Sequence, residues 1–389
     1  MAEWIECTLN DLGEIVGGAT PSTQREDYYG GDISWITPKD LSSLQGRYIS
    51  RGERNITKKG LASCSAQLMP PKTILFTSRA PIGYVAIAEQ TVCTNQGFKS
   101  IVPNAKVNPL FLYYLLVYNK EAIEAMGSGT TFKEVSGKAM RTVKVRIPSD
   151  MQSQIKIASL LDSIDSKIEA NAKLNDNLQQ QAFSVFDNLI ANAEDNDCTV
   201  SDYAFLNPKR TLAKTQVARS IDMSQLSTSG AFPSGWEMKP FNGGMRFTNG
   251  DTLLARITPC LENGKTAFID FLDDGEVAFG STEYIVLAPK NDTPSEMLYC
   301  LARYPAFVDY AVKNMNGSSG RQRVSAETVG QYRLPLFDSH SLLLFKEIVS
   351  PMFLKMRYNS LENMRLAELR DALLPKLMSG EIDVSAIQL

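Results

Sequence analysis

The amino-acid sequence predicts an α+β protein in which two mainly-β globular domains alternate with two long helices. Two observations carry this prediction. The chain of 389 residues repeats itself, with the same series of short motifs in the same order in each half. Each half also ends in a long stretch whose apolar residues recur every three or four positions, which is the spacing of an amphipathic or coiled-coil helix.

The internal repeat is carried by motifs that recur along both halves. The matched stretches are ISWITPKDL (33–41) with RSIDMSQL (219–226), KTILFTSRAPIG (72–83) with DTLLARITPCLENG (251–264), TNQGFKSIVP (94–103) with GSTEYIVLAP (280–289), and GSGTTFKEVS (127–136) with GSSGRQRVS (317–325). Two unrelated α+β domains are the alternative, but they would not share an ordered series. We therefore infer a tandem duplication.

Within each half, short β-branched runs are separated by Gly, Pro and Asn, which predicts strands joined by turns. The runs are TILF, YVAIA and SIVP in the first half and TLLARI, TAFIDF and YIVLAP in the second. Each half adds an aromatic stretch of helical character, LFLYYLLVY (110–118) or MLYCLARYPAFVDYA (297–311). These patterns predict globular domains at residues 1–149 and 193–338.

A heptad pattern follows each globular domain, within residues 150–192 and 339–389. The first seam comprises Ile157, Leu161, Ile164, Ile168, Asn171, Asn175, Leu178, Ala182, Val185 and Leu189, and its counterpart lies 188 residues later. Ordinary core packing is the alternative for one such stripe, but two equivalent seams favour mutual pairing as an antiparallel coiled coil. The first seam spans roughly 50 Å at the rise of an α-helix. Arg370 interrupts the second seam, and Pro351 predicts a kink or a late start of that helix.

Two asparagines stand in each seam, Asn171 and Asn175 in the first and Asn359 and Asn363 in the second. Buried asparagine lowers the stability of a coiled coil but fixes its register, because a slipped pairing leaves amide groups without partners. We expect these four residues to specify one alignment of the two helices.

The composition is that of an ordinary globular protein, with 43% apolar and 21% charged residues. No run of about 18 apolar residues and no signal-peptide pattern is present, so we expect no membrane segment. The six cysteines are scattered without a CxxC pair, and His340 is the single histidine. We therefore expect no metal site, and the cysteines are interpreted as reduced thiols in the cytoplasm.

The net charge of −3 argues at first against a nucleic-acid partner. However, residues 150–197 hold nine acidic and three basic side chains, whereas residues 1–149 hold 17 basic and 13 acidic ones. The acidity is thus concentrated around the first predicted helix, and the first globular domain is mildly basic.

Sequence signals of catalysis are missing. With one histidine, Ser-His or Cys-His machinery would have to use His340, just before the last helix. The chain contains no GxxxxGK[ST] loop, no GxGxxG after a strand, and no [DNS]PP[YFW] motif of amino-methyltransferases. These features favour a binding protein over an enzyme.

The ordered motifs resemble the specificity (S) subunit of type I restriction–modification systems over essentially the full chain. The resemblance is carried by GGATPST (17–23), WITPKDL (35–41), SIDMSQLSTSG (220–230), GGMRFTNGDTLLARITPCLENGKTAF (243–268), GSTEYIVL (280–287), GSSGRQRV (317–324) and LLPKLMSGEI (373–382).

This resemblance implies that each globular domain is a target recognition domain for one half of a bipartite, asymmetric site on double-stranded DNA. It implies that the coiled coil sets the half-site spacing and docks two modification (methyltransferase) subunits. S-adenosylmethionine would belong to those subunits, and ATP and Mg to the restriction (motor–nuclease) subunits, with no cofactor on this chain. A protein–protein scaffold with two β globules on a rod is the alternative, and an enzyme that methylates or cuts DNA itself has less support.

Candidate DNA-contacting residues are polar side chains in loops, because arginine, lysine and hydroxyl groups dominate DNA contacts. In the second domain we favour Arg321, Gln322 and Arg323, and in the first domain their counterparts Thr130, Thr131, Phe132 and Lys133; a solvated polar loop is the alternative.

Further candidates are Thr20, Ser22 and Thr23, in a loop that a plain turn explains equally well, together with Lys39, Arg79 and Arg256. Arg256 alternates with Leu254 and Ile257 in a strand-like run, so a structural ion pair is as good an interpretation as DNA contact.

Overall fold

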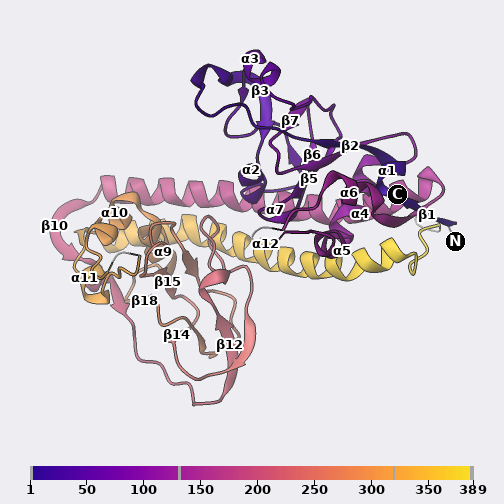
Figure 1. Cartoon of the computed structure of the whole chain (residues 1–389). Helices are drawn as coiled ribbons and strands as arrows, with labels where there is room; N and C mark the ends of the chain where they lie inside the picture. The colour runs from indigo at the N-terminus through magenta and orange to yellow at the C-terminus, as the bar shows by residue number, and fades with distance from the viewer. Residues whose placement is uncertain (1–2, 130–132, 319, 386–389) are drawn as a thin grey trace. The chain divides into compact units, whose positions relative to one another are not determined.

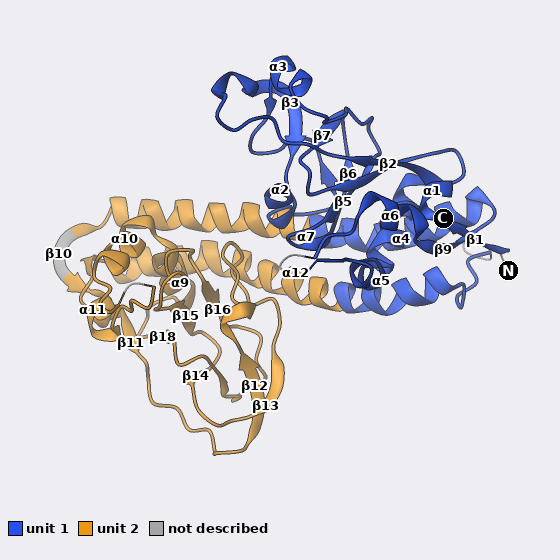
Figure 2. Ribbon diagram, in the orientation of Figure 1, with its two compact units in different colours: residues 1–169, 366–389 blue, residues 170–365 orange. Residues whose placement is uncertain are grey.

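The structure is a computed structural model that describes residues 3–129, 133–318 and 320–385 (Figure 1). The chain divides into two compact units, Met1–Glu169 with Leu366–Leu389 (unit 1) and Ala170–Arg365 (unit 2), coloured separately in Figure 2. Both long helices cross the boundary, so each unit consists of a globular part and a portion of each helix.

The globular part of unit 1 combines small sheets with short helices. Its elements are β1 (Trp4–Thr8), α1 (Leu9–Leu12), β2 (Gly13–Gly17), η1 (Glu26–Tyr28), β3 (Tyr29–Ile36), α2 (Pro38–Ser42), β4 (Tyr48–Ile49), α3 (Lys58–Ala62), β5 (Ile74–Ser78), β6 (Ile82–Ala88), β7 (Val92–Thr94), β8 (Lys99–Pro103), α4 (Pro109–Tyr118), α5 (Lys120–Ala125), α6 (Gly137–Thr142) and β9 (Lys144–Pro148). The main sheet has the order β2-β8-β5-β6-β4, and β1-β9 and β3-β7 form separate pairs.

Unit 2 repeats this plan. Its elements are β10 (Glu194–Thr199), α8 (Val200–Tyr203), β11 (Ala204–Leu206), β12 (Val217–Ile221), η2 (Met223–Gln225), β13 (Glu237–Pro240), β14 (Met245–Phe247), β15 (Thr252–Ala255), β16 (Thr266–Phe268), β17 (Ala278–Gly280), β18 (Tyr284–Pro289), α9 (Ser295–Arg303), α10 (Pro305–Lys313), α11 (Ala326–Gly330) and β19 (Arg333–Leu336). Its sheets have the orders β11-β18-β15-β16, β13-β12-β17-β14 and β10-β19.

The two topologies confirm the duplication inferred from the motifs. The antiparallel pair β1–β9 corresponds to β10–β19, and the parallel pair β3–β7 corresponds to β12–β17. A local detail repeats as well. Thr8 begins α1 with its amide donating to the Asp11 carboxylate (2.8 Å), and Thr199 begins α8 with the same contact to Asp202 (2.7 Å).

The central strand of each main sheet is buried on both faces, which explains its nearly continuous run of apolar residues. Every residue of β5, including Phe76, is buried, and so is every residue of β15. The aromatic stretches form α4 in unit 1 and the pair α9–α10 in unit 2, as predicted, and their apolar faces complete the two cores.

The predicted long helices are α7 (Met151–Ala191) and α12 (Ser339–Ser379), each of 41 residues, or about 60 Å at the α-helical rise. Within each unit the two helices pack against each other, and the seam residues are buried or half-buried. In unit 2, Asn171 contacts Asn363 while Asn175 contacts Asn359, so the helices run antiparallel as predicted.

The expected late start of the second helix at Pro351 is wrong. α12 begins at Ser339, where the Asp338 carboxylate accepts hydrogen bonds from the amides of His340 (2.9 Å) and Ser341 (3.0 Å). This cap satisfies two of the free amides of the first turn. The helix then continues through Pro351, whose exposed ring replaces one amide donor in a long run. No helix among the described residues combines the length and apolarity needed to cross a membrane.

Candidate nucleic-acid interface

In unit 1 the candidate residue Thr20, together with Ser78 and Pro38, which precede the candidates Arg79 and Lys39, contacts the short segment Asn95–Gly97 between β7 and β8. The carbonyl of Gly97 accepts a hydrogen bond from the Ser78 amide (2.7 Å), and the side chain of Thr20 donates to that of Gln96. A Cβ atom at Gly97 would lie 3.0 Å from the ring of Pro38, so the first residue of α2 also packs closely against this segment. Loops distant in sequence therefore meet at one place.

A tight hairpin lies beside this segment. The backbones of Ser128 and Glu134 exchange two hydrogen bonds (3.1 and 2.9 Å). The Glu134 carboxylate lies 3.6 Å from Arg79 and 3.3 Å from Lys99, so it meets two of the basic groups here. Lys133 is exposed next to it. The structure thus places Arg79 beside Glu134, which follows exposed Lys133 in the chain, whereas Thr130, Thr131 and Phe132 lie outside the described residues.

Two aromatic side chains form hydrogen bonds with the backbone of the loop that carries Thr20, Ser22 and Thr23. The Trp35 indole donates to the carbonyl of Ala19 (3.0 Å), and the Tyr29 hydroxyl donates to that of Pro21 (2.7 Å). Ser22 and Thr23 are exposed beyond these anchors. Lys39 is exposed too, with its ammonium group 2.6 Å from Glu53.

Unit 2 has an equivalent hairpin. Asn316 and Arg323 exchange two backbone hydrogen bonds of 2.9 Å, and the Gln322 carbonyl accepts hydrogen bonds from both the amide and the hydroxyl of Thr258 (3.0 Å each). The charge arrangement is the reverse of that in unit 1. Here the base of the hairpin carries the cation, Arg323, and the segment beside it supplies the acid, Glu283.

The Arg323 guanidinium is engaged by Glu283 through a fork of hydrogen bonds, with Nε at 2.9 and 3.0 Å and Nη2 at 2.7 Å. These bonds lower the pKa of the Glu283 carboxyl and raise the pKa of Arg323. Arg323 therefore orders the hairpin. Arg321, two residues before it, is exposed, and its side chain makes no hydrogen bond with the part of the chain that the structure describes.

Arg256 does not lie within a strand, because β15 ends at Ala255. It is half-buried, its amide donates to the Glu283 carbonyl (3.0 Å), and its carbonyl accepts from the Val324 amide (3.0 Å). Its charge also contributes, after the hydrogen bonds from Arg323, to the lowered pKa of Glu283. Arg256 thus takes part in the same charged group as Arg323.

Sequence reasoning missed Gln96, although its stretch was recognised as a repeated motif. Gln96 is exposed in the middle of the segment Asn95–Gly97, where the loops of unit 1 meet. A side-chain amide can form a paired hydrogen bond with adenine. Exposed cations on the β3 side of unit 1 were also missed, among them Arg54, Lys58 and Lys59. Arg54 stacks on the Tyr29 ring at 4.1 Å. The run RGERNITKK (51–59) was the available signal for these cations.

The four seam asparagines form two amide pairs. Asn171 Nδ2 donates to Asn363 Oδ1 (2.9 Å) and to Glu362 (2.7 Å). Asn359 Nδ2 donates to Asn175 Oδ1 (2.8 Å), and Asn175 Nδ2 reaches the carbonyl of Met356 (3.3 Å). Asn171 and Asn359 are nearly fully buried, with 3% and 1% exposure.

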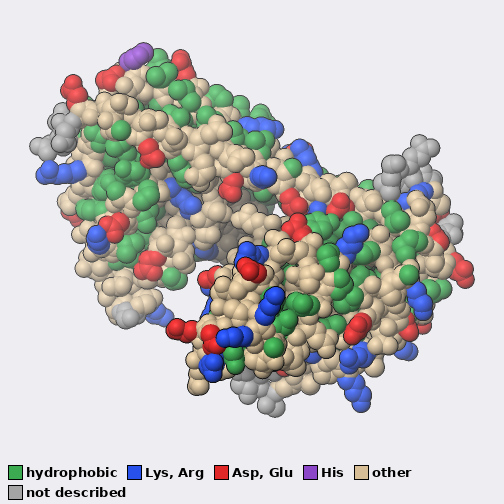
Figure 3. All heavy atoms as spheres, turned by 90° about the horizontal axis from the view of Figure 1, so that it is seen from above, with side chains coloured by type: hydrophobic (Ala, Val, Ile, Leu, Met, Phe, Trp, Pro, Cys, Tyr) green, Lys and Arg blue, Asp and Glu red, His purple; other side chains and the backbone are tan. Residues whose placement is uncertain are grey.

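Charged side chains of both signs are interspersed on the face drawn in Figure 3, rather than gathered into one basic block. Within the described ranges, no group of three or more His, Cys, Asp or Glu side chains is arranged to hold a metal ion.

Comparisons with known proteins agree with one another. The family described as "Type I restriction modification DNA specificity domain" matches residues 1–180. The type I restriction enzyme MjaIX specificity subunit of Methanocaldococcus jannaschii is 31% identical over 435 residues, which cover 99% of this chain and 95% of that protein. The HindI specificity subunit of Haemophilus influenzae is 24% identical, covering 98% of this chain and all of that protein.

The fold has a solved counterpart. The crystal structure of the type I restriction–modification S subunit from M. genitalium superposes with a TM-score of 0.62 at 17% identity, covering 97% of this chain and 96% of that one. The likeness to this structure concerns the fold, and the full-length similarity to the Methanocaldococcus jannaschii subunit defines the family. This chain therefore belongs to the specificity subunits of type I restriction–modification systems.

Proposed function

We propose that this chain reads a bipartite, asymmetric site on double-stranded DNA, with residues 1–149 and 193–338 as two target recognition domains. The observation that carries the proposal is the repeated hairpin. Both domains present it at the same place in the fold, next to an exposed loop segment, but with different side chains and reversed charges. A duplicated reader with altered contact residues suits a site whose two halves differ in sequence.

In the second domain, exposed Arg321 is our first candidate for base contact, because its guanidinium presents a fork of donors that matches guanine. Arg323, Gln322 and Arg256 would hold the loop in place. In the first domain, Gln96 and Thr20 are candidates for base contact. Lys39, Arg79 and Lys133, with Ser22, Thr23, Thr130 and Thr131, are candidates for phosphate contact.

The helices α7 and α12 would set the spacing of the two half-sites, with Asn171, Asn175, Asn359 and Asn363 fixing their register. The pairs of amide hydrogen bonds support this role, because a slip of either helix would leave buried amides without partners. One turn of B-DNA measures roughly 34–36 Å, so helices of about 60 Å are long enough for readers that leave unread base pairs between them.

The chain would act as the non-catalytic part of a cytoplasmic complex. Two modification subunits would bring S-adenosylmethionine, and restriction subunits would bring ATP and Mg. A protein–protein scaffold remains the rival function, since two globules on a helix pair could also gather protein partners.

A gel-shift with a pool of random DNA duplexes, with and without the modification subunits, separates the two functions. A DNA reader enriches a subset of duplexes over successive rounds, and enrichment is strongest with the modification subunits present. A scaffold assembles with its partners but retains DNA without sequence preference. Arg365→Ala, which removes an exposed charge on α12, is the control for charge loss, and it should leave the enriched sequences unchanged.

A further inference from the structure

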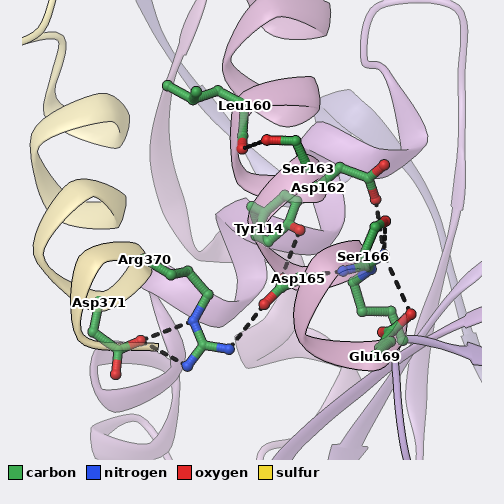
Figure 4. Close-up of polar contacts among 10 residues, drawn as sticks. Tyr114, Leu160, Asp162, Ser163, Asp165, Ser166, Glu169, Arg370 and Asp371 are labelled. Atoms are coloured by element: carbon green, nitrogen blue, oxygen red, sulfur yellow. Dashed lines mark hydrogen bonds and ion pairs between the residues drawn. The ribbon is translucent and has the colours of Figure 1, made fainter. Parts of the chain in front are cut away.

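Unit 1 contains a buried group of charges where its globular part meets the helices (Figure 4). Arg47, only 4% exposed, lies before β4 and reaches the acidic face of α7. Its guanidinium lies 3.0 Å from Asp162, 3.4 Å from Asp165 and 3.6 Å from Glu169. Burial works against the charge of Arg47, but the charges of its neighbours nevertheless raise its pKa.

Asp165 is the centre of this group. Its carboxylate accepts a hydrogen bond from the Tyr114 hydroxyl of α4 (2.7 Å) and another from Arg370 of α12 (2.9 Å). In Figure 4 it lies between these two side chains. Arg370, which appeared in the sequence as a break in the second seam, is therefore the α12 partner of a buried acid on α7. We call Arg47, Asp162, Asp165, Glu169, Tyr114 and Arg370 the charged cluster.

The equivalent place in unit 2 is aromatic. The 188-residue shift between the helices takes Asp165 to Phe353 and Arg370 to Ala182. Phe232 follows the matched Leu226 by the same interval as Arg47 follows Leu41. Phe353 packs against Phe268 (5.2 Å between ring centres) and Tyr299 (5.5 Å), and Phe268 packs against Phe232 (6.0 Å). At these positions the junction of unit 1 is charged and that of unit 2 is aromatic, although Arg357 of α12, the counterpart of Glu169, forms an ion pair with Asp270 (3.2 Å).

This difference matters for which helices pair. In a pair formed by α12 with α12 of a second chain, the same register would set Arg370 against Phe353, so Arg370 would lose Asp165 and keep only Asp371 of its own helix (2.8 Å) among the carboxylates that it contacts here. In a pair formed by α7 with α7, it would set Asp165 against Ala182 and remove one of its cations. Asp165 is only 7% exposed, and the loss of one cation beside a buried carboxylate is destabilising.

The amide pairs themselves do not make this distinction. The same shift takes Asn171 to Asn359 and Asn175 to Asn363. Amide would therefore face amide in a pair of like helices, as it does between Asn171 and Asn363. The amide pairs thus fix the register. Only the added bonds from Asn171 to Glu362 (2.7 Å) and from Asn175 to Ser360 (3.2 Å), whose counterparts on α7 are Leu174 and Ala172, would be lost in a pair of α7 helices.

We propose that the charged cluster of unit 1, set against the aromatic junction of unit 2, selects pairing of α7 with α12 over pairing of either helix with its own copy in a second chain. The selection keeps two different globular domains on one helix pair. Its value for reading an asymmetric site rests on the proposed function. The selection itself can be tested without DNA, so each can fail alone.

The test uses the full chain with a protease site inserted between Asn192 and Ala193, just after α7. The folded protein is cleaved and then held in enough urea for an isotope-labelled copy to exchange its pieces with an unlabelled one. Cleavage gives one piece that contains α7 (residues 1–192) and one that contains α12 (residues 193–389). An unlike pair joins one of each, whereas a like pair joins two copies of the same piece. Native mass spectrometry measures the amounts of both kinds of pair. We expect unlike pairs to exceed like pairs at least about tenfold in the wild type, because in a pair of α7 helices buried Asp165 loses one of its two cations and in a pair of α12 helices Arg370 loses one of its two carboxylates.

Arg370→Ala should lower the ratio of unlike to like pairs by about tenfold, towards equal amounts, because α12 no longer carries the charge that contacts Asp165. Arg370→Met keeps the side-chain volume and serves as a second variant if the alanine variant folds poorly. Arg365→Ala removes an exposed charge from the same helix and should behave as the wild type. Abundant like pairs in the wild type, or Arg370 variants with the wild-type proportion, would overturn the proposal.

Discussion

At the scale of single residues, the two hairpins differ in which side chains remain available. Arg323 is held by Glu283 through three hydrogen-bond contacts, whereas exposed Arg321 is not engaged in this way. The sequence GSSGRQRV places both arginines in one loop and cannot rank them, because Glu283 lies 40 residues away in the chain. The structure separates an arginine that orders the loop from one that is free to meet a ligand.

We expect Arg321→Ala to weaken sequence-specific DNA binding while leaving the melting temperature unchanged. Arg323→Ala should lower the melting temperature, because Glu283 and the hairpin lose their contact, and should weaken DNA binding indirectly. Thermal unfolding and DNA titration of both variants at one moderate salt concentration test this. Equal melting temperatures for the two variants would show that the Glu283 contact does not order the loop.

A second residue-scale prediction concerns Asp251, which is 1% exposed and paired with Arg210. Burial raises the pKa of Asp251 to about 6, although the Thr248 amide and Arg210 act in the opposite direction. The folded state therefore binds a proton more tightly than the unfolded state. The resulting stabilisation is complete below about pH 4 and is lost as the pH rises through about 6.

The stability advantage of the wild type over Asp251→Asn should accordingly fall by up to about 3 kcal/mol between pH 4 and pH 7, at roughly 1.4 kcal/mol per pKa unit. Urea unfolding of both proteins at several pH values in this range measures it. A difference that is constant with pH would mean that Asp251 titrates as it does in the unfolded chain.

At the scale of elements, the heptad pattern predicted both long helices, their seams and their direction. It left Arg370 unexplained, and the late start that it allowed at Pro351 is wrong, for physical reasons. Pro351 removes one amide donor from a 41-residue helix, and packing and the Asp338 cap outweigh that loss. Arg370 is explained by Asp165, which is 205 residues away and invisible to any local pattern.

The asparagine pairs give an element-scale prediction. Asn359→Leu alone should destabilise the protein by about 1–3 kcal/mol, because Asn175 loses its buried donor. Asn175→Leu combined with Asn359→Leu removes both amides, so the double variant should be more stable than either single variant. A double-mutant cycle by chemical unfolding measures the coupling. Additive effects would show that the two amides do not act as a pair.

At the scale of the whole molecule, the sequence revealed the duplication, because motif order survives divergence of the loops. It did not reveal the charged cluster, since the acidic face of α7 looks like an ordinary solvated surface until Arg47 and Arg370 are seen against it. It also missed Gln96, whose importance depends on the loops that meet around it. A local sequence pattern does not show which loops, far apart in the sequence, come into contact in the folded protein.

The central claim is that each globular domain reads its own half of one DNA site. It is tested most directly by sequencing the DNA selected from a random pool by complexes assembled with the wild type, Gln96→Ala or Arg321→Ala. The wild type should select two conserved blocks separated by a gap of fixed length. Each variant should alter one block, and not the same one. A single continuous block, or a variant that changes both blocks together, would contradict the claim.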